Sequence, residues 1–362
     1  MNNCSEYVGS GHPDKVADLV ASHLLDAFVR HDPKTRFALE VQMKDHVCNL
    51  AGEVTSTWNP AGGEIADLAR EAIRKVGYTA EYASRWPEGA TLNADKVAVN
   101  CYIGRQSPDI ARGVDREGWG DQGIFAGMAT CEPEFGYMPR DRHFANVIGK
   151  TLYNAALRNE IPIGLDIKVL VSLKSACRRA EQVIVAAPML PENEAAARAA
   201  SRRVVDAVLE GHGYACDELV VNGTGAYVIH STVGDAGVVG RKLAVDFYGL
   251  NCPVGGGTTW GKDGSKADLT LNLNARYLSL KTMLERKGEF AAVYTKIGCC
   301  IGKSRCLVAQ FDGGNNPIGE YQADILPSEM VRRFGLDGSV RDDMFFHMCR
   351  EGLFAYVDSL AV

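Results

Sequence analysis

The order of predicted helices and strands recurs three times along the 362-residue chain, and this recurrence limits the fold more than any other feature. Each round opens with a long amphipathic helix, at about residues 14, 141 and 266. Two strands follow that helix, and further helices come after them. The amino acids themselves do not repeat, so the spacing predicts a repeat of architecture, with three similar α+β domains.

The first round shows the periodicity behind this prediction. Between residues 13 and 30, apolar residues recur every four positions, which is typical of the buried face of a helix. Alternating apolar residues predict strands at 37–43 and 48–54, arranged as a hairpin. The other predicted segments are helices at 65–76, 141–158, 192–210, 266–286, 327–334 and 341–357, and strands at 97–103, 167–173, 182–187, 218–221, 292–297 and 306–311.

Three domains are expected, at residues 1–110, 111–232 and 233–362, with an exchange of segments between them allowed. Glycine, with 38 residues in all, concentrates where these units join, at 104–127 and 234–264. Backbone N–H groups in such segments can approach a ligand closely, and flexible linkers are the alternative.

Charge and composition exclude several classes of protein. The formal net charge of -6 leaves no general basic surface for a nucleic acid. No apolar run is long enough to cross a bilayer, and the first residues lack the features of a signal peptide, so we expect no membrane partner and a cytoplasmic location. The 11 cysteines include no C-x-x-C pair, which argues against a disulfide framework and a zinc site.

The first of three polar clusters lies at the predicted start of the first helix. Gly11-His12-Pro13-Asp14-Lys15 places an imidazole, a carboxylate and an amine where free N–H groups and the helix dipole attract anions. This arrangement suits a phosphate with its metal ion. A plain polar helix cap is the alternative.

The second cluster combines Gly104-Arg105-Gln106-Ser107-Pro108-Asp109-Ile110 with Gly120-Asp121-Gln122-Gly123. Glutamine and aspartate between glycine and proline can hold an amino acid or a ribose by hydrogen bonds from a loop of fixed conformation. A solvated surface loop is the alternative.

The third cluster holds the densest charge. It joins Gly234-Asp235-Ala236-Gly237 and Gly240-Arg241-Lys242 to a glycine-rich run from Gly255 to Asp268. Cations can neutralise phosphate oxygens while aspartates hold a metal ion, so a polyphosphate site is predicted. The run also fits G-x-x-x-x-G-K, but Asp263 stands where a P-loop has Ser or Thr.

Together these motifs resemble the signatures of the S-adenosylmethionine synthetases, also called methionine adenosyltransferases. The resemblance covers residues 4 to 280, in order and with matching intervals. It implies a fold of three structurally similar α/β-sandwich domains about a pseudo-threefold axis. It also implies the reaction: methionine sulfur attacks C5′ of ATP, and the released tripolyphosphate is hydrolysed to phosphate and diphosphate.

The resemblance assigns roles to individual positions. The implied catalytic residues are His12, Lys168, Arg241, Lys262 and Lys266. ATP and its phosphates would contact Lys15, Asp121, Tyr227, Arg241, Lys242, Lys262 and Lys266. Methionine would contact Glu53, Gln106 and Asp235, two Mg²⁺ ions would bind Asp14 and Asp268, and K⁺ would bind Glu40. From their own surroundings, the alternatives are that Lys168 is a plain surface residue and that Glu40 simply faces solvent.

The family's active sites lie between subunits, so a homodimer is implied, alone or paired into a tetramer. Some segments depart from the family pattern: residues 222–227 read N-G-T-G-A-Y where the family has N-P-T-G-R-F, so Gly223 and Ala226 replace a proline and an arginine. The stretch between Met128 and Lys168 and the tail after residue 340 also differ. We therefore expect a compact, divergent member. A homologue limited to tripolyphosphate hydrolysis, or to nucleotide binding, is the alternative.

Overall fold

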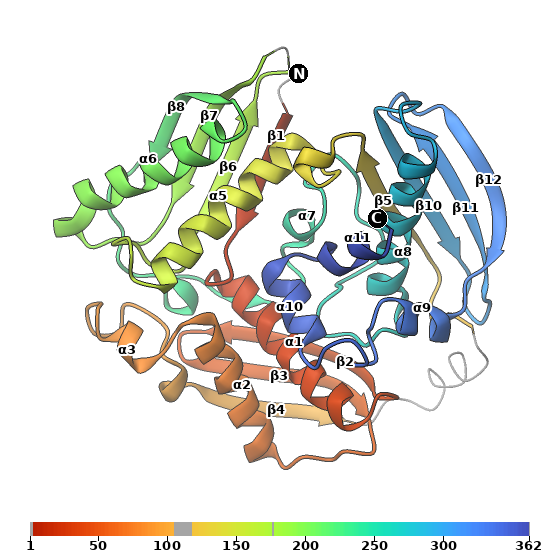
Figure 1. Cartoon of the computed structure of the whole chain (residues 1–362). Coiled ribbons are helices and arrows are strands. Elements are labelled where there is room, and N and C mark those ends of the chain that lie inside the picture. The colour runs from red at the N-terminus through yellow and green to blue at the C-terminus, as the bar shows by residue number, and fades with distance from the viewer. Residues whose placement is uncertain (1–2, 105–117, 176, 362) are drawn as a thin grey trace.

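Three four-stranded sheets surround a common centre in the computed structural model, which describes residues 3–104, 118–175 and 177–361 (Figure 1). The N-terminal sheet has the order β4-β3-β2-β9, formed by Ala98–Gly104, Val47–Thr55, Arg36–Lys44 and Gly237–Val238. The central sheet has the order β1-β6-β7-β8, formed by Asn3–Val8, Lys168–Leu173, Arg179–Ala186 and Ala215–Val221. The C-terminal sheet has the order β12-β11-β10-β5, formed by Pro317–Asp324, Arg305–Asp312, Ala292–Cys299 and Gly123–Thr130.

One long helix packs on each sheet: α1 (Pro13–His31) on β2 and β9, α5 (Arg140–Leu157) on β1 and β6, and α8 (Ala267–Glu285) on β5 and β10. Residues 13–29 of α1 are all buried, because other helices cover the face that the sheet leaves free. The remaining helices are α2 (Gly62–Val76), α3 (Ala80–Ala83), α6 (Glu194–Glu210), α7 (Leu243–Asp246), α9 (Pro327–Arg333), α10 (Met344–Glu351) and α11 (Ala355–Ala361). The predicted α+β class and the hairpin β2–β3 are confirmed.

Each sheet takes one antiparallel edge strand from a different part of the chain. β1 pairs with β6, β5 pairs with β10, and β9 pairs with β2. The segment 1–110 thus gives a strand to the central sheet, 111–232 gives one to the C-terminal sheet, and 233–362 gives one to the N-terminal sheet. This cyclic exchange ties the three units together, and the domain boundaries themselves stay a prediction.

Two parts of the sequence-based prediction need correction. β1, β5, β9 and β12 were not predicted, because three of them lie in or beside polar, glycine-rich motifs and β12 lacks a regular alternation of buried residues. The helix predicted at 341–357 is two helices, α10 and α11. Gly352 separates them with a φ of 124°, which L residues rarely adopt.

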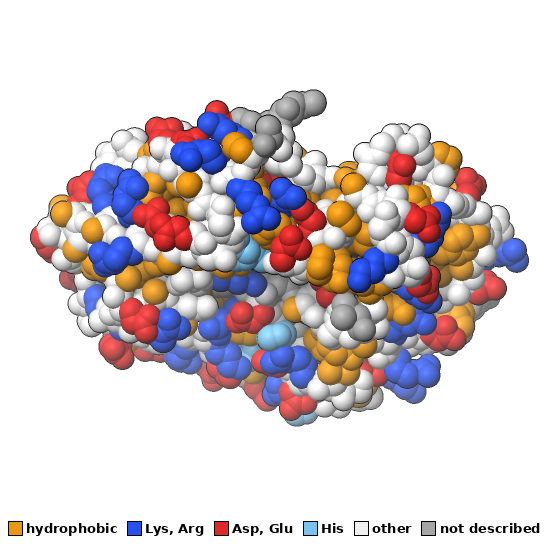
Figure 2. Space-filling model, turned by 45° about the horizontal axis from the view of Figure 1, so that its top comes forward, with side chains coloured by type: hydrophobic (Ala, Val, Ile, Leu, Met, Phe, Trp, Pro, Cys, Tyr) orange, Lys and Arg blue, Asp and Glu red, His pale blue; other side chains and the backbone are white. Residues whose placement is uncertain are grey.

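Acidic and basic side chains are interspersed on the molecular face drawn in Figure 2. Among the described residues, no helix is both long enough and apolar enough to span a membrane.

Candidate active site

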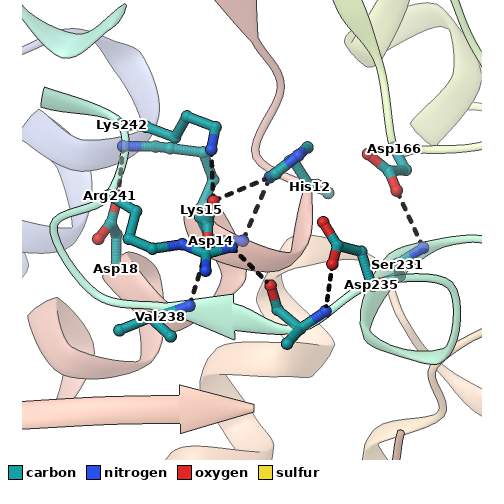
Figure 3. Close-up of polar contacts among 12 residues, drawn as sticks. His12, Asp14, Lys15, Asp18, Asp166, Ser231, Asp235, Val238, Arg241 and Lys242 are labelled. Carbon is teal, nitrogen blue, oxygen red and sulfur yellow. Dashed lines mark hydrogen bonds and ion pairs between the residues drawn. The ribbon is translucent and has the colours of Figure 1, made fainter. Parts of the chain in front are cut away.

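Two close backbone contacts bring distant segments to the start of α1. A Cβ atom added to Gly11 would lie 2.3 Å from the carbonyl oxygen of Leu165, and one added to Gly237 would lie 2.2 Å from that of Pro13. Only glycine permits these approaches. As a result, the ends of the segments that carry Asp166 and Arg241 meet at the N-terminus of α1 (Figure 3).

His12 is the N-cap of α1 and is only 4% exposed. Its Nδ1 accepts a hydrogen bond from the backbone N–H of Asp14 at 3.2 Å. Burial lowers the pKa of His12 to about 3, and the positive charges of Lys168 and Lys242 act in the same direction. The imidazole is therefore neutral near pH 7, and because Nδ1 is an acceptor, Nε2 carries the proton.

Asp14 binds β9 and the loop that follows it. Its Oδ1 accepts from Val238 N at 2.8 Å and Arg241 Nε at 2.9 Å, and its Oδ2 lies 2.5 Å from Lys242 Nζ. Burial alone would raise the pKa of Asp14, but these bonds, above all that from Lys242, hold the pKa below its ordinary value. Asp14 is therefore an ionised carboxylate beside two cations.

Asp166 is a buried carboxylate beside this cluster that sequence reasoning did not assign. It accepts a hydrogen bond from Ser231 N at 3.0 Å, and burial raises its pKa to about 6 although Lys168 opposes the shift. The hydroxyl of Tyr227 donates to the backbone oxygen of Asp166 at 3.2 Å. The sequence contained one signal that could have identified Asp166: it is a single carboxylate in an otherwise apolar run just before β6.

Asp235 and Lys168 complete this cluster. The side chain of Asp235 is exposed and accepts from Ala236 N at 2.7 Å, and its negative charge opposes the lowering of the pKa of His12. Lys168 is the first residue of β6, and its positive charge lowers the pKa of His12. The structure thus brings together six of the predicted residues: His12, Asp14, Lys168, Asp235, Arg241 and Lys242.

A second cluster lies at the start of α8. Asp268 accepts from Gly257 N at 2.5 Å and pairs with Lys262 Nζ at 2.6 Å. The Nζ atom of Lys266 is buried without a hydrogen bond, 3.8 Å from a carboxylate oxygen of Asp263. Such a buried donor would be satisfied by an anion.

Strand register joins this second cluster to the outer face of the N-terminal sheet, the face opposite α1. Ala38 of β2 pairs with Glu53 on one side and forms an isolated bridge with Lys262 on the other. Paired residues point to the same side of a sheet, so Glu53 and Lys262 share this face. Glu40 is exposed on it as well.

Three other predicted residues have different surroundings. Lys15 is buried, lies 2.6 Å from Asp246 and 3.0 Å from Asp18, and stands over the ring of Trp260. Asp121 is exposed just before β5, where its backbone oxygen contacts the thiol of Cys299. Gln106 lies outside the described residues. The roles expected for these residues stay predictions.

The carboxylates Asp14 and Asp268 stand beside cations rather than in an acidic cluster. Within the described ranges, no group of three or more His, Cys, Asp and Glu side chains comes together as a metal site. Mg²⁺ in ATP-dependent enzymes is typically held by one or two carboxylates and by phosphate oxygens of the substrate. Both aspartates fit this pattern, because a phosphate chain could attract the lysines and the arginine away from them.

Similarity to known proteins extends over most of the chain. The family model of the S-adenosylmethionine synthetase N-terminal domain matches residues 1–108, and that of the C-terminal domain matches residues 229–333. The S-adenosylmethionine synthase of Wolinella succinogenes is 37% identical over 294 residues, which cover 76% of this chain and 71% of that protein. The chain belongs to the S-adenosylmethionine synthetase family.

Other relatives agree with this assignment. The S-adenosylmethionine synthase of Helicobacter pylori strain 26695 is 36% identical over 294 residues, covering 76% of this chain and 71% of that protein. The solved structure described as an unusual S-adenosylmethionine synthetase from Campylobacter jejuni superposes with a TM-score of 0.84 at 25% identity. The superposition covers 99% of this chain and 97% of the Campylobacter jejuni chain.

The predicted family, fold class and activity are thereby confirmed. The protein is a methionine adenosyltransferase, which transfers the adenosyl group of ATP to the sulfur of methionine. S-adenosylmethionine synthetases bind ATP and methionine and use a divalent metal and potassium.

Proposed function

We propose that this S-adenosylmethionine synthetase breaks the C5′–O bond of ATP at the start of α1, with His12 donating a hydrogen bond to the departing oxygen. The tautomer of His12 carries this proposal. Because Nδ1 accepts the N–H of Asp14, Nε2 carries the proton of the neutral ring and is the nitrogen that can donate to a ligand. A neutral donor stabilises an oxygen that gains negative charge in the transition state. It binds the intact triphosphate less tightly than a charged donor would.

Methionine sulfur is an uncharged nucleophile, so it needs orientation more than activation. Glu53 and Asp235 would bind its amino group, and Gln106 would also contact methionine.

The barrier falls mainly because cations stabilise the negative charge that collects on the tripolyphosphate. Lys168, Arg241 and Lys242 would contact it at one end, and Lys262 and Lys266 at the other. Asp166 and Tyr227 would border the adenosine.

Asp14 and Asp268 would each hold one Mg²⁺, which would neutralise phosphate oxygens. When a phosphate chain enters, Lys242 and Lys262 are the groups that would turn from these carboxylates toward it, because each lies within 2.6 Å of a carboxylate oxygen and is only partly buried. Glu40 would bind K⁺ on the outer face of the N-terminal sheet.

A second copy of the chain would cover the outer faces of the N-terminal and C-terminal sheets. Tyr102 of β4 is 67% exposed there and Ile124 of β5 is 66% exposed. Large apolar side chains in such positions favour a protein interface. The homodimer would therefore enclose Glu53 and Lys262, and a cytoplasmic location agrees with the supply of ATP.

The first test is a product assay with purified protein, ATP, methionine, Mg²⁺ and K⁺. We expect equal amounts of S-adenosylmethionine, phosphate and diphosphate, and none of them when methionine is omitted. Phosphate release without the sulfonium product would instead indicate an enzyme limited to triphosphate hydrolysis, and would contradict the proposal.

The role of His12 is tested by His12→Asn, which keeps an N-cap oxygen for the Asp14 N–H. Formation of S-adenosylmethionine should fall by about 10²-fold or more, because one donor to the departing oxygen is lost. Hydrolysis of added tripolyphosphate should change by less than about tenfold, since C5′ takes no part in that step. Equal losses in both assays would place His12 elsewhere in the site.

A further inference from the structure

A cavity of about 270 Å³ lies on the helical side of the molecule, away from the proposed active site. Its walls come from α5, α7, α10 and α11, which gather near the centre of Figure 1. Of the predicted site residues that the structure describes, only Lys15 lines it, and His12, Asp14, Lys168 and Lys242 do not. The cavity is therefore a separate feature of the fold.

One face of α5 supplies the cavity with two cations that have no carboxylate partner. Arg142, Asn146 and Lys150 are spaced four apart and all line the cavity. Arg142 is only 4% exposed and donates to two backbone oxygens, Phe247 O at 3.1 Å and Glu6 O at 2.7 Å. Lys150 donates to the backbone oxygen of Glu351. Neither cation makes an ion pair with a carboxylate in the described part of the chain.

The acidic side chains of the cavity wall are already engaged. Asp246 binds Lys15 at 2.6 Å through Oδ1 and the indole N–H of Trp260 at 2.7 Å through Oδ2. Asp358 binds Arg276 through both of its oxygens, each at 2.8 Å. Glu351 lies 3.3 Å from Arg350. These carboxylates thus bind other partners directly, and Asp246 and Glu351 act on Arg142 and Lys150 only through longer-range electrostatic attraction.

Arg142 remains charged near pH 7, because burial lowers its pKa only to about 10. Burial also lowers the pKa of Lys150, whereas the charge of Glu351 raises it. A buried charge without a counter-ion is costly, and an incoming anion would recover part of that cost. The anion would meet Arg142 and Lys150 on one side and the buried Tyr7 beside them.

Another part of the wall is apolar and aromatic, formed by Phe135, Met138, Phe247, Trp260, Leu353 and Phe354. Ligand pockets typically combine such a lining with a few polar groups that fix orientation, and this volume suits a small molecule. We propose that the cavity is a second ligand site of this protein, which binds a small organic anion through Arg142 and Lys150 and covers the apolar body of that anion with its aromatic wall.

The test uses 2-naphthoate as the probe and the neutral 2-naphthamide, of the same shape, as its control. Isothermal titration of the full-length protein should show one 2-naphthoate bound per chain. The amide should bind at least about tenfold more weakly, because charge-assisted hydrogen bonds are lost. Binding should persist when a non-hydrolysable ATP analogue and Mg²⁺ saturate the active site. Absence of 2-naphthoate binding, equal binding of the amide, or displacement by the ATP analogue would each overturn the proposal.

Two substitutions test whether 2-naphthoate binds in this cavity. Lys150→Met keeps the length of the side chain and should weaken 2-naphthoate binding at least about fivefold, whereas Lys281→Met, on the exposed face of α8, is the matched control and should leave it unchanged. Asn146→Trp should abolish binding by filling the cavity, with thermal unfolding as the check that the variant folds. Unchanged affinity in Lys150→Met would contradict the assigned site even if Asn146→Trp failed to fold.

Discussion

The three long helices each begin with an aspartate at their second residue, and the three aspartates have different surroundings. Asp14, Asp141 and Asp268 stand at equal intervals along the chain, in α1, α5 and α8. Asp14 and Asp268 each accept one backbone N–H and pair with a lysine, Lys242 or Lys262. Asp141 instead accepts from neutral groups, Ser5 Oγ at 2.7 Å and Asn251 Nδ2 at 3.1 Å.

This difference separates a helix cap from a binding site. A carboxylate in the first turn is favoured by the free N–H groups and the dipole of any helix, so all three positions are suited to aspartate. Only where a cationic, glycine-rich loop faces the helix can the partners of the carboxylate exchange for a phosphate and a metal ion. The repeated architecture therefore supplies three equivalent positions, and we propose that the facing loops make two of them functional.

The largest effects are expected from the aspartates themselves. Asp14→Asn and Asp268→Asn should each lower S-adenosylmethionine formation by about 10³-fold at the Mg²⁺ concentration that suits the unmodified protein, and should raise the Mg²⁺ requirement. Asp141→Asn should leave the rate within about threefold and lower the free energy of unfolding by about 1–3 kcal/mol, since only buried neutral hydrogen bonds change. Rates measured across a Mg²⁺ titration decide this, and an equal loss in Asp141→Asn would break the comparison.

A smaller loss is expected from Lys266→Ala. This lysine caps α8 and its buried Nζ makes no hydrogen bond within the described chain, so a phosphate oxygen is its expected partner. Adenosyl transfer and hydrolysis of added tripolyphosphate should both fall by about 10²-fold. Lys281→Ala on the exposed face of α8 is the control and should be silent in both assays. Unimpaired hydrolysis would remove Lys266 from the phosphate site.

The smallest effect concerns the residues that cap the three helices, which are His12, Pro139 and Lys266. His12 titrates near neutrality in the unfolded chain, at a pKa of 6.5, whereas burial lowers its pKa to about 3 in the folded protein. The unfolded chain therefore binds more protons, and stability is lost as the pH falls below 6.5 toward 3. From pH 7 to about pH 5, His12 should account for a loss of about 2 kcal/mol.

Urea unfolding of the natural protein and of His12→Asn, at both pH values, measures this loss. The variant keeps an N-cap and the other buried histidines, His23 and His230, so the difference between the two proteins isolates His12. We expect the variant to lose less stability between the two pH values. Equal losses of stability in the natural protein and in the variant would show that His12 is protonated in the folded protein.

Much of the fold could be predicted from local patterns. α1, α5 and α8 begin within a residue or two of the predicted positions, because a buried helical face leaves a regular apolar spacing. The hairpin β2–β3 follows in the same way from alternation. In contrast, β1, β5 and β9 pair only with strands far along the chain, so their partners leave no local pattern. Asp166 and the ion pairs of Lys15 were missed for the same reason.

By itself, the sequence determined the family, the reaction and the charged residues of the candidate site. These can be read from the order of the motifs along the chain, which combine glycine, cations and aspartates and need no tertiary structure to be recognised. Only the tertiary structure decided which of these residues meet. The exchange of β9 into the N-terminal sheet carries Arg241 and Lys242 to Asp14, and the burial of His12 between two cations makes it neutral. Both depend on contacts between residues far apart in the chain, and such contacts exist only once the three sheets have packed together.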